Sequence, residues 1–285
     1  MSKNKGTSLW KRRLQKFLNN KLATMGLIVF MIILFASIFA PFITKYDPNE
    51  VNLSLIAKPP TWEHILGTDK LGRDVFARVL YGGRVSIQVG VFGAVFAAII
   101  GSVLGGIGGY YGGKLDAILV RMSEVFLTFP SLIIVLTLSA IIGPGIFNLI
   151  FVFAITGWMT TFRIVRNEFL SLKQETYVEV CRSFGYSHSR IIFNNILPNA
   201  LSPVIISLSL NVAGFVLEEA GLSFLGVGVP SSVPTWGNII NAAKSIDVIQ
   251  NYWWLWITPG IFITLFILSI NFIGDGLRDI MDPKQ

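Results

Sequence analysis

Charged residues, cysteine and histidine are all scarce in this sequence, and each shortage argues against a class of protein. Only 14% of the 285 residues are charged, whereas soluble domains carry roughly 25%. The single cysteine, Cys181, leaves no partner for an internal disulfide. The two histidines, His64 and His188, lie far apart in sequence, so no Cys/His cluster is present to hold a structural zinc. The sequence therefore indicates neither a disulfide scaffold nor a zinc site.

Long hydrophobic runs are present instead. Hydrophobic residues make up 53% of the chain, and the mean hydropathy is +0.64. A helix needs about 20 apolar residues to cross the hydrocarbon core of a bilayer. Four of the five charge-free stretches suit one crossing each, and the third is roughly twice that length, with a turn signal at Gly143-Pro144-Gly145. The five stretches are 22–44, 85–113, 125–162, 191–217 and 248–274. The sequence thus predicts an all-α membrane protein with six transmembrane helices.

The positions of Lys and Arg predict the orientation of these helices. Cytoplasmic segments of membrane proteins carry an excess of both residues. With the N-terminus inside, the inner segments hold more than twice as many of the 23 Lys and Arg residues as the outer segments. We therefore expect both termini in the cytoplasm. The net charge of +7 follows from basic residues at the ends of apolar spans, so it does not indicate a nucleic-acid partner.

These boundaries divide the chain into segments. Residues 1–21 are basic with apolar residues at helical spacing, which predicts a short amphipathic helix on the inner membrane surface; a disordered basic tail is the alternative. Residues 22–44 form a first transmembrane helix that is too long for the apolar core of a signal peptide. The remaining segments are an extracytoplasmic loop at 45–84, a five-helix transmembrane core at 85–275 with an inner loop at 163–198, and a cytoplasmic C-terminal tail at 276–285.

A glycine-rich stretch at 108–115 is similar in spacing to a phosphate-binding loop but lacks its chemistry. Leu115 stands where a Ser or Thr would bind magnesium, and the stretch follows a membrane span, not a buried strand. We therefore expect this chain to bind no nucleotide and no other cofactor. Close helix packing explains the glycines better, because small residues four apart let two membrane helices approach: Gly101, Gly105 and Gly109.

Two acidic residues, Glu218 and Glu219, lie next to an apolar span. A carboxylate at the bilayer centre costs roughly 2.5–3.5 kcal/mol. If the helix starts near Asn199, a rise of 1.5 Å per residue places Glu218 about 28 Å further along, near the outer boundary, where the cost is smaller. Two interpretations remain open. The pair lines an outer gate or the translocation path, or it forms hydrogen bonds with a neighbouring helix or subunit.

The inner loop carries a pattern that predicts a helical hairpin. Residues 175–184 contain neither Pro nor Gly, and Gly185 then supplies a helix stop, because glycine adopts the left-handed conformation without a steric penalty. Ser187 is a suitable N-cap for a second short helix that reaches Pro198. Apolar residues of this loop would lie outside the membrane, where they either bind a protein partner or fold back onto the helix ends. They are Val178, Val180, Phe184 and Tyr186.

This loop resembles the EAA loop in the membrane subunits of bacterial ABC importers. The pattern of that loop is EAA-x-x-x-G followed further on by Leu-Pro. Four positions of this sequence match it: Glu179, Gly185, Leu197 and Pro198. The two alanines are replaced by Val180 and Cys181, a departure that is conservative in size.

Several other motifs are similar, in the same order, to the peptide/nickel branch of that family. Leu66-Gly67-Thr68-Asp69 and Gly72-Arg73-Asp74 precede the second predicted helix, and this arrangement after a single helix resembles the C-type member of the dipeptide and oligopeptide permease pair. Further matches are Leu222-Ser223-Phe224-Leu225-Gly226, Trp236-Gly237-Asn238 and Gly274-Asp275-Gly276-Leu277-Arg278-Asp279. The resemblance covers nearly the whole chain from the first helix onward.

The resemblance implies a type I ABC importer permease fold in the bacterial inner membrane. The chain would pair with a second, related permease, two ATPase subunits would dock on the inner loops, and an extracytoplasmic binding protein would deliver the substrate. ATP and magnesium would be bound in the ATPase subunits, so this chain would not itself be an enzyme. The implied substrates are di- or oligopeptides, with nickel or a metal chelate as the alternative.

The coupling loop and the outer loop provide the candidate site residues. The resemblance implies that the ATPase-coupling loop includes Glu175, Val178, Glu179, Cys181, Gly185, Leu197 and Pro198. In the outer loop, Asp69, Arg73 and Asp74 either form a structural turn that ties the loop to the helix ends, which we favour, or contact the binding protein.

Two rival classes fit the sequence less well. A secondary transporter needs coupling-ion sites, which usually lie at broken helices near the midplane. Mid-span charges are absent here, although Pro259-Gly260 could break the sixth helix. A membrane enzyme needs clustered catalytic groups, whereas the outer loops carry only scattered charged residues.

Overall fold

The computed structural model describes residues 9–281, and this part of the chain is almost entirely helical. Residues 1–8 and 282–285, which belong to the predicted terminal segments, lie outside the described residues. The elements are α1 (Leu9–Asn19), α2 (Lys21–Ile38), α3 (Ala40–Ile43), η1 (Leu53–Leu55), α4 (Val75–Tyr111), α5 (Gly113–Thr128), α6 (Ser131–Ile142), α7 (Ile146–Leu172), α8 (Thr176–Ser183), α9 (His188–Arg190), the π-helical η2 (Ile191–Ile196), α10 (Leu197–Leu225), α11 (Trp236–Ile240), η3 (Asn241–Lys244), α12 (Ile246–Asn251) and α13 (Trp254–Met281).

Six apolar spans can be assigned among these helices. Five are long and apolar enough to cross a membrane alone: α2, α4, α7, the run from α9 through α10, and α13. The sixth is the pair α5 and α6, which is bent by 91° at a short break. Pro130 stands at this break, and the preceding Phe129 is extended, as the ring of a following proline favours. The expected turn at Gly143-Pro144-Gly145 does separate α6 from α7, but the bend before α6 was not anticipated.

Two element boundaries differ from the expectation. Helix α4 begins at Val75, not near Val85, because the carboxylate of Asp74 caps it by accepting the Ala77 N–H at 2.7 Å. The outer loop expected at 45–84 is therefore shorter, and we call residues 44–74 the cap segment. Helix α13 continues to Met281, so the expected tail at 276–285 is helical as far as it is described.

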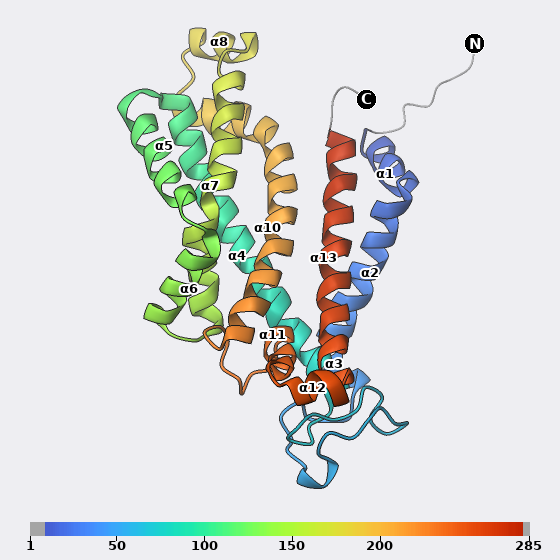
Figure 1. Ribbon diagram of the computed structural model, residues 1–285. Coiled ribbons are helices and arrows are strands. Elements are labelled where there is room, and N and C mark those ends of the chain that lie inside the picture. Colours follow the sequence, from blue (N-terminus) through green and yellow to red (C-terminus); the bar gives the residue numbers. More distant parts are fainter. Residues whose placement is uncertain (1–8, 282–285) are drawn as a thin grey trace, which may run out of the picture.

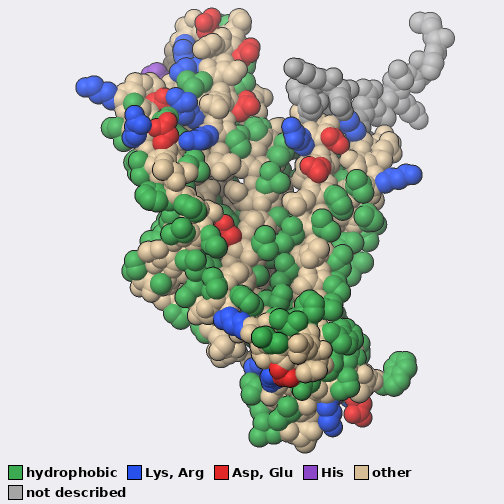
Figure 2. Space-filling model, in the orientation of Figure 1, with side chains coloured by type: hydrophobic (Ala, Val, Ile, Leu, Met, Phe, Trp, Pro, Cys, Tyr) green, Lys and Arg blue, Asp and Glu red, His purple; other side chains and the backbone are tan. Residues whose placement is uncertain are grey.

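The elements gather at two ends of a helical bundle. Helices α1 and α8 and the last turns of α13 lie at one end, and α3, α11, α12 and the cap segment lie at the other (Figure 1). We call these the hairpin end and the cap end. In Figure 2, Lys, Arg, Asp and Glu side chains gather mainly at the two ends, and hydrophobic side chains cover much of the surface between them. This distribution is the one expected of a protein that crosses a bilayer.

Helix α4 packs most extensively against α7, and glycines make this possible. A Cβ atom at Gly101 would lie 2.6 Å from the Trp158 carbonyl oxygen, and one at Gly105 would lie 2.7 Å from that of Phe162. The third glycine of the series, Gly109, is equally close to the backbone of α7. The close packing predicted from the four-residue spacing is thus confirmed, and it joins α4 and α7 into one unit.

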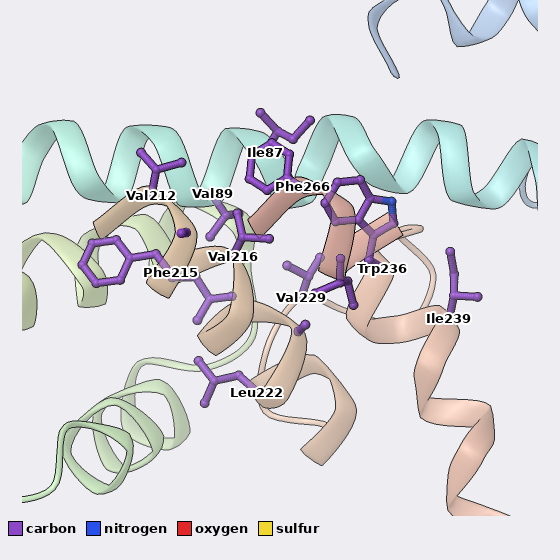
Figure 3. Close-up of a cluster of buried hydrophobic side chains, with 14 of the residues drawn as sticks. Ile87, Val89, Val212, Phe215, Val216, Leu222, Val229, Trp236, Ile239 and Phe266 are labelled. Atoms are coloured by element: carbon purple, nitrogen blue, oxygen red, sulfur yellow. The ribbon is translucent and has the colours of Figure 1, made fainter. Parts of the chain in front are cut away.

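The main hydrophobic core lies where α4, α10, α11 and α13 meet towards the cap end. Figure 3 shows Trp236 of α11 beside Phe266 of α13, with Ile87 of α4 and Val216 of α10 close by. The rings of Trp236 and Phe266 have their centroids 5.6 Å apart, and the indole Nε1 donates to the Val79 carbonyl at 3.0 Å. The polar edge of this buried tryptophan is thereby satisfied.

Candidate functional site

The predicted helical hairpin is present between α7 and α10, and we use this name for residues 175–198. Its first helix, α8, is closed by two backbone hydrogen bonds: the Gly185 N–H donates to Arg182 at 2.9 Å, and the Tyr186 N–H donates to Cys181 at 3.1 Å. These bonds form a Schellman motif, which requires a left-handed residue, and Gly185 has φ +73°. The second helix, α9, follows at once, with the Ser187 hydroxyl as its N-cap.

One side of α8 anchors the hairpin to the bundle. Val178 is 0% exposed and belongs to a hydrophobic cluster with Phe169 of α7 and Ile196 of η2. Cys181 is half-buried against the same cluster, where its sulfur accepts a weak hydrogen bond from the Asn195 amide at 3.5 Å. Of the four apolar loop residues, Val178 thus folds back onto the helix ends, which was one of the two expected outcomes.

The opposite side of the hairpin is exposed and partly apolar. Phe184 is 77% exposed at the tip, and Val180 and Tyr186 are also exposed. Charged residues lie among them, namely Glu175, Glu179 and Arg182, all of which are exposed. A short, rigid element with an apolar and charged rim is a suitable surface for docking another protein.

Leu197 and Pro198 mark the point where the hairpin joins α10. The segment before them, η2, is π-helical, and such segments are frequently found at functional sites. Pro198 lies in the first turn of α10 and has no N–H to donate to a carbonyl four residues earlier, which favours a departure from the α-helical pattern there. The Leu-Pro pair therefore sets a change of helical geometry between the hairpin and a membrane span.

Two side-chain contacts tie the hairpin region to the end of α4. The Tyr110 hydroxyl lies 2.7 Å from Nδ1 of His188 in α9, and Lys173 donates to the Gly109 carbonyl at 3.0 Å. A bidentate ion pair between Arg166 of α7 and Asp116 of α5 lies at the same end of the bundle. Tyr110 and His188 were not singled out from the sequence, because their contact depends on how α4 and α9 pack.

The stretch at 108–115, whose glycine spacing is similar to that of a phosphate-binding loop, does not form such a loop in the structure. Gly108 lies inside α4, and the chain turns at Gly112 and Gly113, both with positive φ, where α4 ends and α5 begins. The stretch is thus divided between the end of α4 and the start of α5, whereas a phosphate-binding loop is one continuous loop that precedes a helix. Its glycines serve close packing and a helix break.

Glu218 and Glu219 face different surroundings although they are adjacent. Glu219 is 0% exposed and accepts hydrogen bonds from Ser86 of α4 and Ser223 of α10, both at 2.7 Å. Glu218 is half-buried, and its contact is a long one of 3.5 Å with Ser131 of α6. The interpretation as a hydrogen bond to neighbouring helices therefore fits Glu219, and Glu218 needs a separate explanation.

The three outer-loop candidates hold the cap segment together. Asp69 accepts from the Arg73 guanidinium at 2.7 Å and from backbone N–H groups of Leu71 and Arg73. Asp74 is buried, caps α4 and lies 2.8 Å from Nδ1 of His64. This arrangement corresponds to the structural turn that we favoured. Arg73 and Asp69 remain partly exposed, whereas the Asp74 carboxylate has little surface to offer a partner.

Comparison with known proteins identifies the family. Residues 73–285 match the family model for the inner membrane component of binding-protein-dependent transport systems, and residues 8–60 match that for the N-terminal transmembrane domain of oligopeptide transport permease C. The chain belongs to this family of transport-system inner membrane components. It is therefore a permease subunit of an ABC transporter, and the type I importer fold expected from the coupling-loop resemblance is confirmed.

Individual relatives agree with this assignment. The chain is 40% identical to the oligopeptide transport system permease protein OppC of Bacillus subtilis, over 98% of this chain and 91% of that protein. It is 39% identical to the dipeptide transport system permease protein DppC of Alkalihalophilus pseudofirmus, with the same coverage of both chains. Among solved structures, an inward-facing form of the methionine ABC transporter MetNI has a TM-score of 0.56 at 18% identity, covering 71% of this chain and 95% of that chain, which shows a shared fold.

Proposed function

We propose that this permease carries di- or oligopeptides across a bacterial inner membrane. We further propose that an ATPase subunit docks on its hairpin and moves it during ATP binding and hydrolysis. The single observation that carries the coupling role is the construction of the hairpin. Its buried side is fixed by Val178 and the Schellman motif, while Val180 and Phe184 are exposed on the other side. A rigid element transmits the movement of a docked partner, and a flexible loop would not.

The proposed assembly contains four kinds of subunit. A second, related permease completes the translocation path, two ATPase subunits bind and hydrolyse ATP with magnesium, and an extracytoplasmic binding protein delivers the substrate. The names of the relatives support peptides as the substrate class. In this proposal the hairpin end is cytoplasmic and the cap end is extracytoplasmic, so both termini are cytoplasmic.

Uptake into proteoliposomes tests this function. The permease, its partner permease, the ATPases and the binding protein are reconstituted together, and uptake of radiolabelled trialanine is followed. We expect uptake that requires ATP and persists when ion gradients are collapsed with ionophores. Uptake driven by an ion gradient without ATP would contradict the proposal, and ATP-dependent uptake of nickel without peptide uptake would assign the other substrate.

A matched pair of phenylalanines tests the docking surface. Phe184 and Phe147 are both highly exposed, but Phe184 lies on the hairpin and Phe147 lies in the first turn of α7. Phe184→Ser is expected to weaken binding of the ATPase subunits in a pull-down assay, and Phe147→Ser is expected to leave it unchanged. Equal binding by both variants would show that the exposed hairpin face is not the docking surface.

The one cysteine tests the orientation. Cys181 lies in the hairpin, so an impermeant thiol reagent should modify it in inside-out vesicles but not in intact cells. The Cys181→Ser variant controls for labelling of other proteins. Modification in intact cells would reverse the assigned orientation.

A further inference from the structure

One face of α10 carries polar groups and glycines that its packing does not explain. Asn211, Gly214, Glu218 and Gly221 follow one another at spacings of three and four residues, so they share a face of the helix. This face points towards α6, because Ser131 of α6 provides the contact with Glu218. Most other residues of α10 are apolar.

Glu218 is a carboxylate without a strong partner. Its contact with Ser131 is 3.5 Å long, and no salt bridge to Glu218 is found among the side chains of residues 14–281. Its neighbour Glu219 accepts hydrogen bonds of 2.7 Å from two serines. An ionisable side chain in a membrane span is expensive unless it is paired or faces a polar path. Glu218 is therefore available to a cationic partner.

Asn211 provides a second free group on the same face. Its amide Nδ2 is buried and has no hydrogen-bond partner in the described part of the chain. Buried donors are nearly always paired, so an unpaired one needs an explanation. Because Asn211 precedes Glu218 by two helical turns, a free donor and a free anionic acceptor stand about 10 Å apart along α10.

The glycines leave room beside Glu218. A Cβ atom built at Gly214 or at Gly221 would meet no atom within 4 Å. Gly214 lies one turn before Glu218 and Gly221 one turn after it, so the helix surface is open on both sides of the carboxylate. This differs from Gly101 and Gly105 of α4, where another helix fills the space.

We propose that this face of α10 is a substrate subsite of the translocation path, with Glu218 binding the ammonium group of a peptide. The Asn211 amide donates to a carbonyl or carboxylate oxygen further along the same peptide. Their separation of about 10 Å corresponds to roughly three extended residues at 3.3–3.6 Å each. This subsite rests on the proposed peptide transport. It adds the residues that bind the peptide, the direction in which the peptide lies along α10, and a preference for peptides with a free amino terminus.

A thiol placed beside Glu218 tests occupancy directly. In a Cys181→Ser background, Gly221→Cys introduces a thiol at an open position, and its modification by a methanethiosulfonate reagent is timed in the complete transporter. Trialanine, delivered by the binding protein with ATP present, is expected to slow modification several-fold. The protection should disappear when Glu218→Gln is added, and Leu217→Cys on the neighbouring face should not be protected. Equal protection with and without Glu218→Gln would overturn the subsite.

Uptake of two peptides tests the chemistry. Glu218→Gln is expected to lower uptake of trialanine roughly tenfold, which is the effect of losing a charge-assisted hydrogen bond. Glu218→Asp keeps the negative charge and should retain part of the wild-type uptake. The ratio of variant to wild-type uptake should be close to one for N-acetyl-trialanine, supplied with saturating binding protein. An equal fall for both peptides, or no fall for trialanine, would overturn the assignment of Glu218. Absence of ATP-dependent peptide uptake in the wild-type protein would instead contradict the proposed function.

Discussion

The two ends of α10 are held by different kinds of contact. At the cap end, the buried Glu219 binds hydroxyl groups of α4 and α10 in a network closed to solvent. At the hairpin end, α8 is held by the buried Val178, by the half-buried Cys181 and by backbone hydrogen bonds at Gly185, and much of its surface is exposed. The cap end is built from specific polar partners, whereas the hairpin end is built to keep its shape while presenting a surface.

The direction of each hydrogen bond explains why the cap end needs a carboxylate. The hydroxyls of Ser86 and Ser223 accept from the backbone N–H groups of Trp236 and Val229, each at 3.2 Å. Each hydroxyl proton is therefore free to point at Glu219, which can accept all of them. Glu219 thus connects α4 and α10 to the segment that leads into α11, and an uncharged amide could not take its place.

Exchanging one acidic side chain for an amide tests this difference most strongly. Glu219→Gln would place an N–H₂ group against hydroxyls that already accept hydrogen bonds, and we expect it to lower the free energy of unfolding by roughly 3 kcal/mol. Thermal unfolding of the purified transporter measures the loss. Glu218→Gln at the adjacent position is the control and should change stability by no more than about 0.5 kcal/mol. Equal losses in the two variants would mean that the network does not hold the cap end.

Two valines of α8 test whether the hairpin has one anchored side. Val178→Ala removes two buried carbon atoms and leaves a small cavity, and we expect it to destabilise the hairpin by about 2 kcal/mol. Faster hydrogen exchange of the α8 amides would measure this. Val180→Ala alters an exposed side chain, so exchange should stay as in the wild type. If both variants exchanged at the wild-type rate, Val178 would not be the anchor.

Gly185 tests whether the Schellman motif at the end of α8 keeps the hairpin rigid. Gly185 has φ +73° and free space around its Cβ position, so the penalty for a larger residue comes from the backbone alone. Gly185→Val should cost roughly 1–2 kcal/mol and lower the peptide transported per ATP hydrolysed while leaving the chain in the membrane. Gly185→Asn is the matched control, because asparagine tolerates the left-handed conformation. Normal coupling in Gly185→Val would show that the Schellman turn is dispensable.

The hairpin was predictable because its signals are local. Gly185 as a helix stop and Ser187 as an N-cap depend on neighbouring backbone groups, and both are found where the sequence placed them. Close packing of α4 on α7 was likewise predictable from the glycine spacing. The number of spans was predictable because this signal is also local: each span must be apolar over its own length.

Features that depend on tertiary partners were not predictable. The different roles of Glu218 and Glu219 depend on which serines face each carboxylate, and the sequence shows no pairing between distant residues. The early start of α4 was missed because charged Arg78 and Arg84 ended the apolar run, although Asp74 is a good N-cap. In the structure, Arg78 donates to the Pro48 carbonyl and Arg84 to that of Ser37, so the cap segment and α2 satisfy both arginines.

An exposed ion pair at the cap end has the smallest expected effect on stability, and it tests whether burial is what makes the other contacts of that end strong. The Asn251 amide and the Lys70 ammonium both bind the Asp247 carboxylate, at 2.9 and 3.0 Å, and hold its pKa below the usual range. Because the folded-state pKa is the lower one, this contribution is present at neutral pH and is lost as the pH falls through it. Asp247→Asn should therefore lower the melting temperature slightly at pH 7 and have no effect at strongly acidic pH, with added salt reducing the difference. A loss at pH 7 as large as that of Glu219→Gln would mean that burial is not what distinguishes the strong contacts of the cap end.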